Sequence, residues 1–193
     1  MKINFKQKLD LTKIKYFVTS DLHFYHKNVM KHCPETRPYA DVNEMNMAII
    51  DAWNSVVGEN DVVFHVGDFY LDYSNKAVRK ERIARLLECL NGTIIFSEGN
   101  HDDALQDIPG LQKHHYLEVR FNGTKVCMSH YTHRAWNGSH HGSVMLFGHS
   151  HGSMPEYGRS MDVGWDAVGG RILPLGEVVN YLINKPIETE DKH

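Results

Sequence analysis

The chain has 193 residues, of which 41% are hydrophobic and 23% are charged, and its formal net charge is -3. This length predicts one domain with a real hydrophobic core. The weakly acidic charge argues against a protein that coats nucleic acid, although it does not exclude a local basic pocket. The 3 cysteines follow no disulfide or Cys-x-x-Cys pattern. No apolar run suits a signal peptide or a membrane span, so we expect a cytoplasmic protein without a membrane partner.

The first half of the chain alternates predicted strands and helices. A short β-prone run covers residues 15–20, and a helix is expected to begin at Asp41, because the D-x-x-E pattern with Glu44 is typical of a helix start. That helix is expected to end before Gly58. The other predicted elements of this half are strand 61–66, helix 83–90 and strand 93–97.

The second half is richer in predicted strands. Two β-prone runs, 116–121 and 125–129, flank Asn122-Gly123, which is a strong hairpin signal. Strands 144–147 and 160–165 and a short helix at 177–182 follow. The pattern predicts an α/β protein with two packed sheets and helices outside them. We expect a single domain over residues 1–185 and a flexible C-terminal tail over 186–193, which begins with proline and is charged.

Polar clusters follow five of the predicted strands, and in α/β proteins ligands bind at such strand ends. Most of the clusters are weak signals when taken alone, because a lone D-x-H or Gly-Asp is usually a turn and two alternating histidines can form an exposed strand face. The four-residue string Gly-Asn-His-Asp is far more specific, and the complete ordered set rarely arises by chance. The clusters are Asp21-Leu22-His23, Gly67-Asp68, Gly99-Asn100-His101-Asp102, Ser129-His130 and Gly148-His149-Ser150-His151.

This ordered set resembles the motifs of the calcineurin-like metallophosphoesterase family: D-x-H, G-D, G-N-H-[DE], an isolated H and G-H-x-H. The stretches TSDLHFYHKN, WNGSHHGS and GHSHG are similar to those of small, uncapped bacterial and phage members. The resemblance spans nearly the whole chain. It implies a four-layer α/β/β/α sandwich of two mixed sheets.

The resemblance also implies two divalent metal ions as cofactors. The implied ligands are Asp21, His23 and His151 for the first metal, Asn100, His130 and His149 for the second, and Asp68 as a bridge. These seven side chains carry only two formal negative charges, so two dications leave the site cationic and attractive to a phosphoryl group. Oxygen and imidazole donors without thiolate suit Mn, Fe, Zn or Ni, and Mn is favoured because it is common in this family.

The implied activity is hydrolysis of a phosphate mono- or diester, with a small phosphate ester or a nucleotide as substrate. A hydroxide bridging the metals attacks phosphorus, and His101 acts as the general acid. Asp102 either orients the imidazole of His101 or caps the following helix. Asn100, His26 and Arg37 are candidate substrate-binding residues, although His26 and Arg37 also suit a solvated loop and a surface position.

A further segment, 133–142, is expected to line the cleft. Its pair His140 and His141 either touches substrate or belongs to an exposed loop.

Two other functions compete with this interpretation. A metal-dependent nuclease of the same family is less favoured, because the net charge is negative and no capping or DNA-binding region is evident; a salt-sensitive affinity for nucleic acid would support it. A non-catalytic scaffold on this fold usually loses metal-site histidines, which this chain keeps. The sequence leaves the physiological substrate, the native metal and the oligomeric state open, because fold and metal site are shared by many enzymes.

Overall fold

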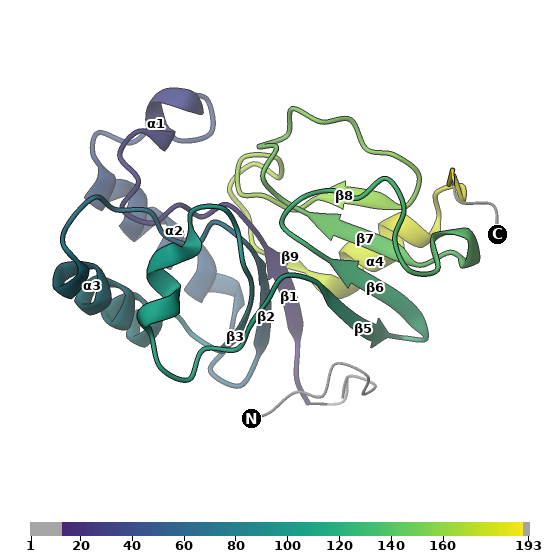
Figure 1. The fold of residues 1–193 in the computed structure, drawn as a ribbon, viewed down its shortest axis with the longest axis horizontal. Helices are drawn as coiled ribbons and strands as arrows, with labels where there is room; N and C mark the ends of the chain where they lie inside the picture. Colours follow the sequence, from purple (N-terminus) through teal and green to yellow (C-terminus); the bar gives the residue numbers. More distant parts are fainter. Residues whose placement is uncertain (1–12, 191–193) are drawn as a thin grey trace.

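The computed structural model describes residues 13–190, in which two β-sheets pack together with helices beside them (Figure 1). The first sheet has the strand order β4-β3-β2-β1-β9, and the second has the order β5-β6-β7-β8. Each sheet contains parallel and antiparallel pairs, since β1 and β9 are antiparallel in the first and β5 and β6 in the second. The predicted α/β fold with two mixed sheets is therefore confirmed.

The strands of both sheets are short. Their bounds in the first sheet are Tyr16–Thr19 (β1), Val62–Val66 (β2), Thr93–Ser97 (β3), Lys113–His114 (β4) and Leu173–Pro174 (β9). In the second sheet they are Leu117–Phe121 (β5), Thr124–Met128 (β6), Val144–Phe147 (β7) and Ser160–Asp162 (β8).

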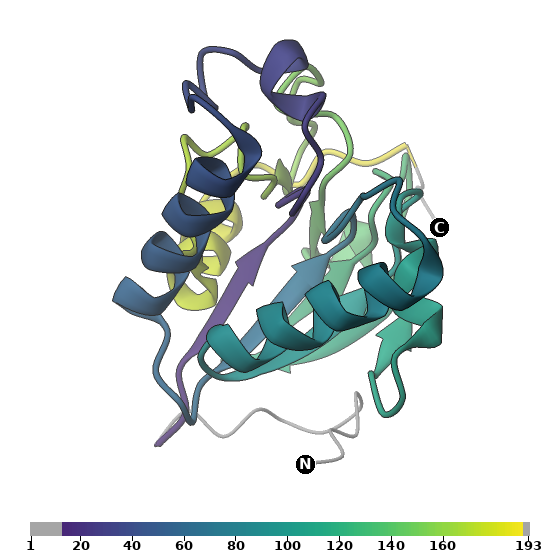
Figure 2. The same cartoon turned by 90° about the vertical axis from the view of Figure 1, so that its left-hand side faces the viewer.

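Two long helices cover the outer face of the first sheet, as Figure 2 shows. They are α2 (Val42–Val56) and α3 (Lys76–Cys89), and the remaining helical segments are α1 (Val29–His32), η1 (Asp102–Asp107), η2 (Ser139–His141) and α4 (Leu175–Ile183). The helix α2 begins where the sequence predicts, because the Asp41 carboxylate accepts hydrogen bonds from the backbone amides of Asn43 and Glu44. In residues 13–190, no helix is long and apolar enough to cross a bilayer.

The central strand β2 separates the two main cores. Its side chains alternate, so that Phe64 packs between the sheets and Val63 packs against the helices α2 and α3. All five of its residues are buried, which explains why its sequence lacks a polar face. The outer face of the second sheet is covered mainly by Trp136, which belongs to the loop between β6 and β7.

The β5–β6 hairpin forms as expected. Asn122 and Gly123 both adopt a left-handed backbone, with φ of 48° and 85°, as a two-residue type I′ turn requires. The predicted strand 160–165 is shorter in the structure, because the Asp162 carboxylate accepts a hydrogen bond from the amide of Gly164 and turns the chain.

The C-terminal tail is described up to residue 190. Thr189 hydrogen-bonds Ser139, and Glu190 pairs with Arg134, so this part of the tail lies along the loop before β7. Residues 191–193 lie outside the described range, and the flexibility predicted for the tail stays a prediction.

Candidate active site

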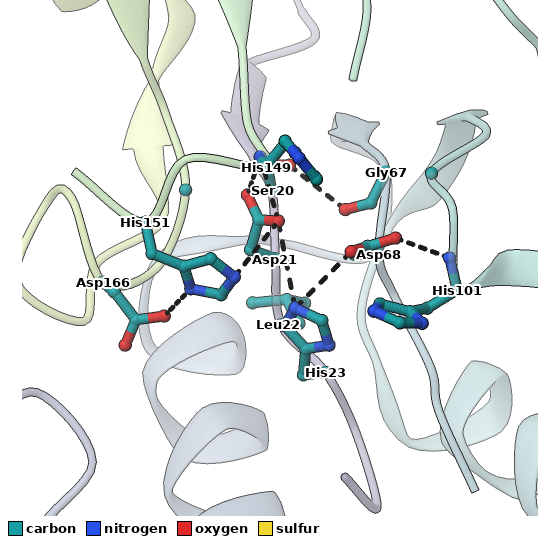
Figure 3. A network of polar contacts seen from close by, with 12 residues as sticks. Ser20, Asp21, Leu22, His23, Gly67, Asp68, His101, His149, His151 and Asp166 are labelled. Carbon is teal, nitrogen blue, oxygen red and sulfur yellow. Dashed lines mark hydrogen bonds and ion pairs between the residues drawn. The ribbon is translucent and has the colours of Figure 1, made fainter. Parts of the chain in front are cut away.

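The predicted site residues sit in strained turns that directly follow strands. Five of them have a left-handed backbone despite carrying a side chain: Asp21 (φ 56°), His23 (52°), Asp68 (56°), His149 (68°) and His151 (48°). Such conformations cost of order 1–3 kcal/mol each and persist only where the surrounding structure enforces them. The turns aim the side chains toward one centre at the strand ends (Figure 3).

Two glycines let the backbone approach these side chains. A Cβ atom at Gly99 would lie 2.2 Å from Oδ1 of Asp68, and one at Gly148 would lie 2.4 Å from Oδ2 of Asp21. Both distances are far below van der Waals contact. The glycines of the Gly-Asn-His-Asp and Gly-His-Ser-His motifs are therefore steric requirements of the site.

The structure brings all seven predicted metal ligands together. They form two groups, in each of which the potential ligand atoms lie within 4.8 Å of one another: Asp21, His23 and His151 in the first, Asp68, His130 and His149 in the second. Asn100 joins the second group, because its Oδ1 lies 3.1 Å from Nε2 of His130.

Asp68 lies between the two groups. Its Oδ2 is 3.6 Å from Nε2 of His23 and 3.5 Å from Nε2 of His130. One carboxylate oxygen thus faces an imidazole nitrogen of each group, which is the geometry that a shared metal ligand needs. Its other oxygen accepts a hydrogen bond from the amide of His101 at 2.9 Å and is held in place.

The donor set fits divalent cations. Nε2 of His23 is buried and has no hydrogen-bond partner within residues 13–190, and the carboxylate oxygens of Asp68 and Asp21 lie 3.6 and 3.9 Å away. A buried unpaired polar atom costs about 1–3 kcal/mol. The spacing is too wide for hydrogen bonds and suits a cation that several donors share.

Two histidines have an oxygen acceptor beside Nδ1, an arrangement that supports metal binding through Nε2. Nδ1 of His130 lies 3.0 Å from the carbonyl oxygen of Val66, and Nδ1 of His151 lies 2.6 Å from Oδ2 of Asp166. When each Nδ1–H donates to its oxygen, the lone pair of Nε2 faces the centre of the site. Such supporting hydrogen bonds are the usual companions of metal-binding histidines.

Burial and mutual charge shift the pKa values of these groups. Burial raises the pKa of Asp21 to about 7 and lowers that of His23 well below its ordinary value. Burial by itself would favour the neutral forms of Asp68 and His130. The hydrogen bond and the opposite charges between these two side chains outweigh the effect of burial, so the pKa of Asp68 is lowered and that of His130 is raised to about 9. Without a cation, the site therefore retains protons at neutral pH.

Arg37 does not have the role that the sequence suggests. It is 1% exposed, its Nε and Nη2 donate to the Asp166 carboxylate at 2.9 Å, and its remaining donors reach the backbone carbonyls of Asp21 and Leu22. A guanidinium committed in this way cannot bind phosphate. The prediction of Arg37 as a substrate-binding residue is wrong, and the residue holds the first motif in place.

Asp166 belongs to the site but was not predicted from the sequence. Its carboxylate joins Arg37, Thr36 and His151, and it is largely buried. The sequence offers one weak cue, an acidic residue in the loop that follows a predicted strand. Cys33 also lies near His151, with Sγ 3.7 Å from Nδ1, but burial raises the pKa of its thiol and disfavours the thiolate that a metal would need.

Asp102 neither orients an imidazole nor caps a helix by its side chain. Its carboxylate accepts hydrogen bonds from the backbone amides of Gly99, Asp68 and Phe69 at 2.8–2.9 Å. Within residues 13–190, the ring of His101 is not among its partners. Asp102 instead ties the loop of Gly99 to the loop of Asp68, and its proposed catalytic role is corrected accordingly.

His101 and His26 border the cleft beside the predicted metal ligands. The ring centroid of His101 is 5.5 Å from that of His23 and 5.8 Å from that of His26. Figure 3 shows His101 on the side of Asp68 opposite His151. Together with Asn100 and His149, these side chains line a cavity of about 500 Å³, which is large enough for a small phosphate ester.

The segment 133–142 does not meet the expectation that it lines this cleft. His140 and His141 line a different cavity, with Arg120, Lys125 and Arg159. The residue of this region that does reach the site is Tyr131, whose hydroxyl donates to Oδ1 of Asn100 at 3.2 Å.

Comparison with known proteins agrees with the fold and with the motifs. Fold and site together define a two-sheet α/β protein with a phosphoesterase-type centre. The family model of the calcineurin-like phosphoesterase superfamily domain matches residues 14–178. The chain belongs to this superfamily, as the motifs predict.

Three individual proteins show how far the similarity extends. Protein MJ1445 of Methanocaldococcus jannaschii is 35% identical over 144 residues, which cover 74% of this chain and 73% of that protein. The gene 66 protein of Mycobacterium phage L5 is 28% identical, over 91% of this chain and 97% of its own. The crystal structure of AQ665 from Aquifex aeolicus superposes with a TM-score of 0.67 at 19% identity, covering 88% of this chain and 100% of that one, and shows the shared fold.

Proposed function

We propose that this protein is a dinuclear-metal phosphoesterase that hydrolyses a phosphate mono- or diester of a small molecule or nucleotide. The observation that carries the proposal is the position of Asp68. Its Oδ2 faces His23 in one ligand group and His130 in the other. Two cations joined by one carboxylate form the usual clamp for phosphoryl transfer. Mn²⁺ is our first choice of metal, followed by Fe, Zn and Ni.

Each side chain has a proposed role. The first cation is held by Asp21, His23 and His151, the second by Asn100, His130 and His149, and both by Asp68. When bound, the cations acidify a water and neutralise charge on the phosphoryl oxygens. Asn100 and His26 also face the cleft, where they position the substrate.

His101 is proposed to protonate the departing oxygen. Its backbone amide is fixed by Asp68 at 2.9 Å, which places the imidazole beside the metal centre, and its ring borders the cleft. A positioned imidazole contributes typically 10²–10⁴-fold to such a step.

The first test is metal content and turnover of the purified protein and of Asp68→Ala. The wild type loaded with Mn should hold close to two ions per chain and hydrolyse nitrophenyl phosphate or bis(nitrophenyl) phosphate. Asp68→Ala should lose occupancy at both positions, because both groups share this residue, and its activity should fall with it. Asp103→Ala, which changes an exposed aspartate nearby, is the matched control. Two ions retained in Asp68→Ala would contradict the shared role.

A further inference from the structure

A second cavity lies at the opposite end of the second sheet from the candidate active site. We call it the hairpin cavity; it has a volume of about 630 Å³ and is lined chiefly by Arg120, Thr124, Lys125, His140, His141 and Arg159. Figure 1 shows the β5–β6 turn and the segment η2 at the same end of the molecule. The size is that of a small-ligand site.

The hairpin cavity is separate from the metal centre. Strand β6 begins at Thr124 beside the cavity and ends at Met128, two residues before His130. At about 3.3 Å per residue, the strand alone separates its two ends by ~13 Å. Strand β7 is arranged in the same way, since Ser143 lines the cavity and His149 lies beyond the other end.

Three cationic side chains line the hairpin cavity, and one carboxylate lies beside it, that of Glu118, which accepts from Nδ2 of the lining residue Asn137. The described residues that line it include Arg120, Lys125 and Arg159 but no aspartate or glutamate. Within residues 13–190, Lys125 has no ion-pair partner, and Arg159 donates to the backbone carbonyls of Lys185 and Gly142 only. Three positive charges therefore converge on one hollow of a protein whose net charge is -3.

Two of these charges are placed against each other. Arg120 and Lys125 are direct cross-strand partners in the β5–β6 ladder. Like charges at directly opposed positions destabilise an antiparallel pair. Nδ1 of His140, another residue that lines the cavity, is buried without a hydrogen-bond partner in the described part of the chain. An anion in the cavity would relieve the repulsion.

We propose that the hairpin cavity binds a small phosphate-bearing anion with two or more negative charges, as a site distinct from the metal centre. Three cations suit the several oxygens of linked phosphates, and the guanidinium groups of Arg120 and Arg159 can donate in pairs to them. An inorganic polyphosphate and the phosphate chain of a nucleotide share this chemistry. The proposal does not depend on the activity proposed for the metal centre.

The test is an amide NMR titration of the zinc-loaded protein with inorganic tripolyphosphate, because zinc is diamagnetic. Amides of Gly123, Gly138 and Gly142 report the hairpin cavity, whereas those of Gly99 and Gly148 report the metal centre. We expect the first set to shift in a saturable way. Arg120→Gln with Lys125→Gln should weaken this response at least tenfold, since two charge-assisted contacts are lost.

The control variant is Lys80→Gln with Arg85→Gln, which removes the same two charges from the exposed face of α3. It should keep the wild-type response, and both double variants should keep the turnover of phosphate ester. Equal shifts with a nucleoside triphosphate would identify the phosphate chain as the recognised part. Any of three results would overturn the proposal. The cavity amides could fail to shift, both double variants could lose the response equally, or only a single-stranded oligonucleotide could produce a response.

Discussion

Replacing Asp166 by asparagine tests the buried network behind the metal centre with the least change in shape. The carboxylate accepts from Nε and Nη2 of Arg37 at 2.9 Å and contacts Nδ1 of His151 at 2.6 Å. The side chains of Arg37 and Asp166 are 0% and 3% exposed. In Asp166→Asn, the guanidinium therefore stays buried without its counter-charge.

The expected loss of stability follows from this burial. Removing one partner of a buried ion pair typically costs about 3–5 kcal/mol. The amide oxygen of asparagine still accepts one hydrogen bond, and Arg37 keeps the carbonyls of Asp21 and Leu22, so we expect the lower end, ~3 kcal/mol. For a domain of this size, each kcal/mol shifts the Tm by roughly 2–4 °C, which gives a fall of about 6–12 °C.

The same substitution should weaken metal binding. In the wild type, Oδ2 of Asp166 contacts both Nη2 of Arg37 and Nδ1 of His151. An amide oxygen carries no full negative charge, so it holds the Nδ1 proton of His151 more weakly and fixes the tautomer less firmly. Loss of such a supporting group usually lowers metal affinity by about 10–100-fold. The effect should appear in a competition titration against a metal-binding dye.

The assays are thermal unfolding of the metal-free chain and the dye competition. Asp103→Asn, at an exposed position, should stay within about 0.5 kcal/mol of the wild type. Arg37→Met combined with Asp166→Asn should recover part of the lost stability, because no buried charge is left unpaired. An unchanged Tm together with unchanged metal affinity in Asp166→Asn would refute this reasoning.

Three further predictions concern the centre itself. His101→Asn should keep the metals but lose roughly 10²–10⁴-fold in kcat on an alkyl or ribose ester. The loss in kcat should be clearly smaller on a nitrophenyl ester, because its leaving group needs little protonation; equal losses on both esters would mean that His101 only positions the substrate. Gly148→Ala should lower both Tm and metal content, since its Cβ would lie 2.0 Å from Ser20 Oγ and 2.4 Å from Asp21 Oδ2; wild-type values would contradict the steric argument. Burial raises the pKa of Asp21 to about 7, so the carboxyl must lose a proton to bind a cation, and metal affinity should fall as the pH is lowered from about 8 to 6; a flat profile in the dye titration would count against this.

Several features of the fold are determined locally and were therefore visible in the sequence. Asn122-Gly123 specifies its turn because both positions need a left-handed backbone, and Asp41 specifies the start of α2 because its carboxylate caps the first amides. The five motifs of the proposed metal site were also visible. Each needs a particular residue type directly after a strand, and parallel strands bring their ends to one edge.

Other features depend on residues that meet only in the folded chain. The contact between Arg37 and Asp166 joins positions 129 residues apart. Because of this contact Arg37 has a structural role, and the same Asp166 carboxylate orients the ring of His151. Asp102 turned out to tie two loops together, because the amides of Asp68 and Phe69 lie within its reach.

The hairpin cavity is also a product of tertiary structure. It combines a cross-strand pair, Arg120 and Lys125, with Arg159 from the approach to a third strand. From the sequence, segment 133–142 was expected to line the catalytic cleft, with His140 and His141 either touching substrate or lying in an exposed loop. Strand β7 is parallel to β6, so it must start at the same end of the sheet at which β6 starts. The connection between the two strands therefore runs back along the sheet and carries His140 and His141 to the end far from the candidate active site. Motifs thus determined which groups gather at the strand ends, whereas the path of the connections decided which other charges face them.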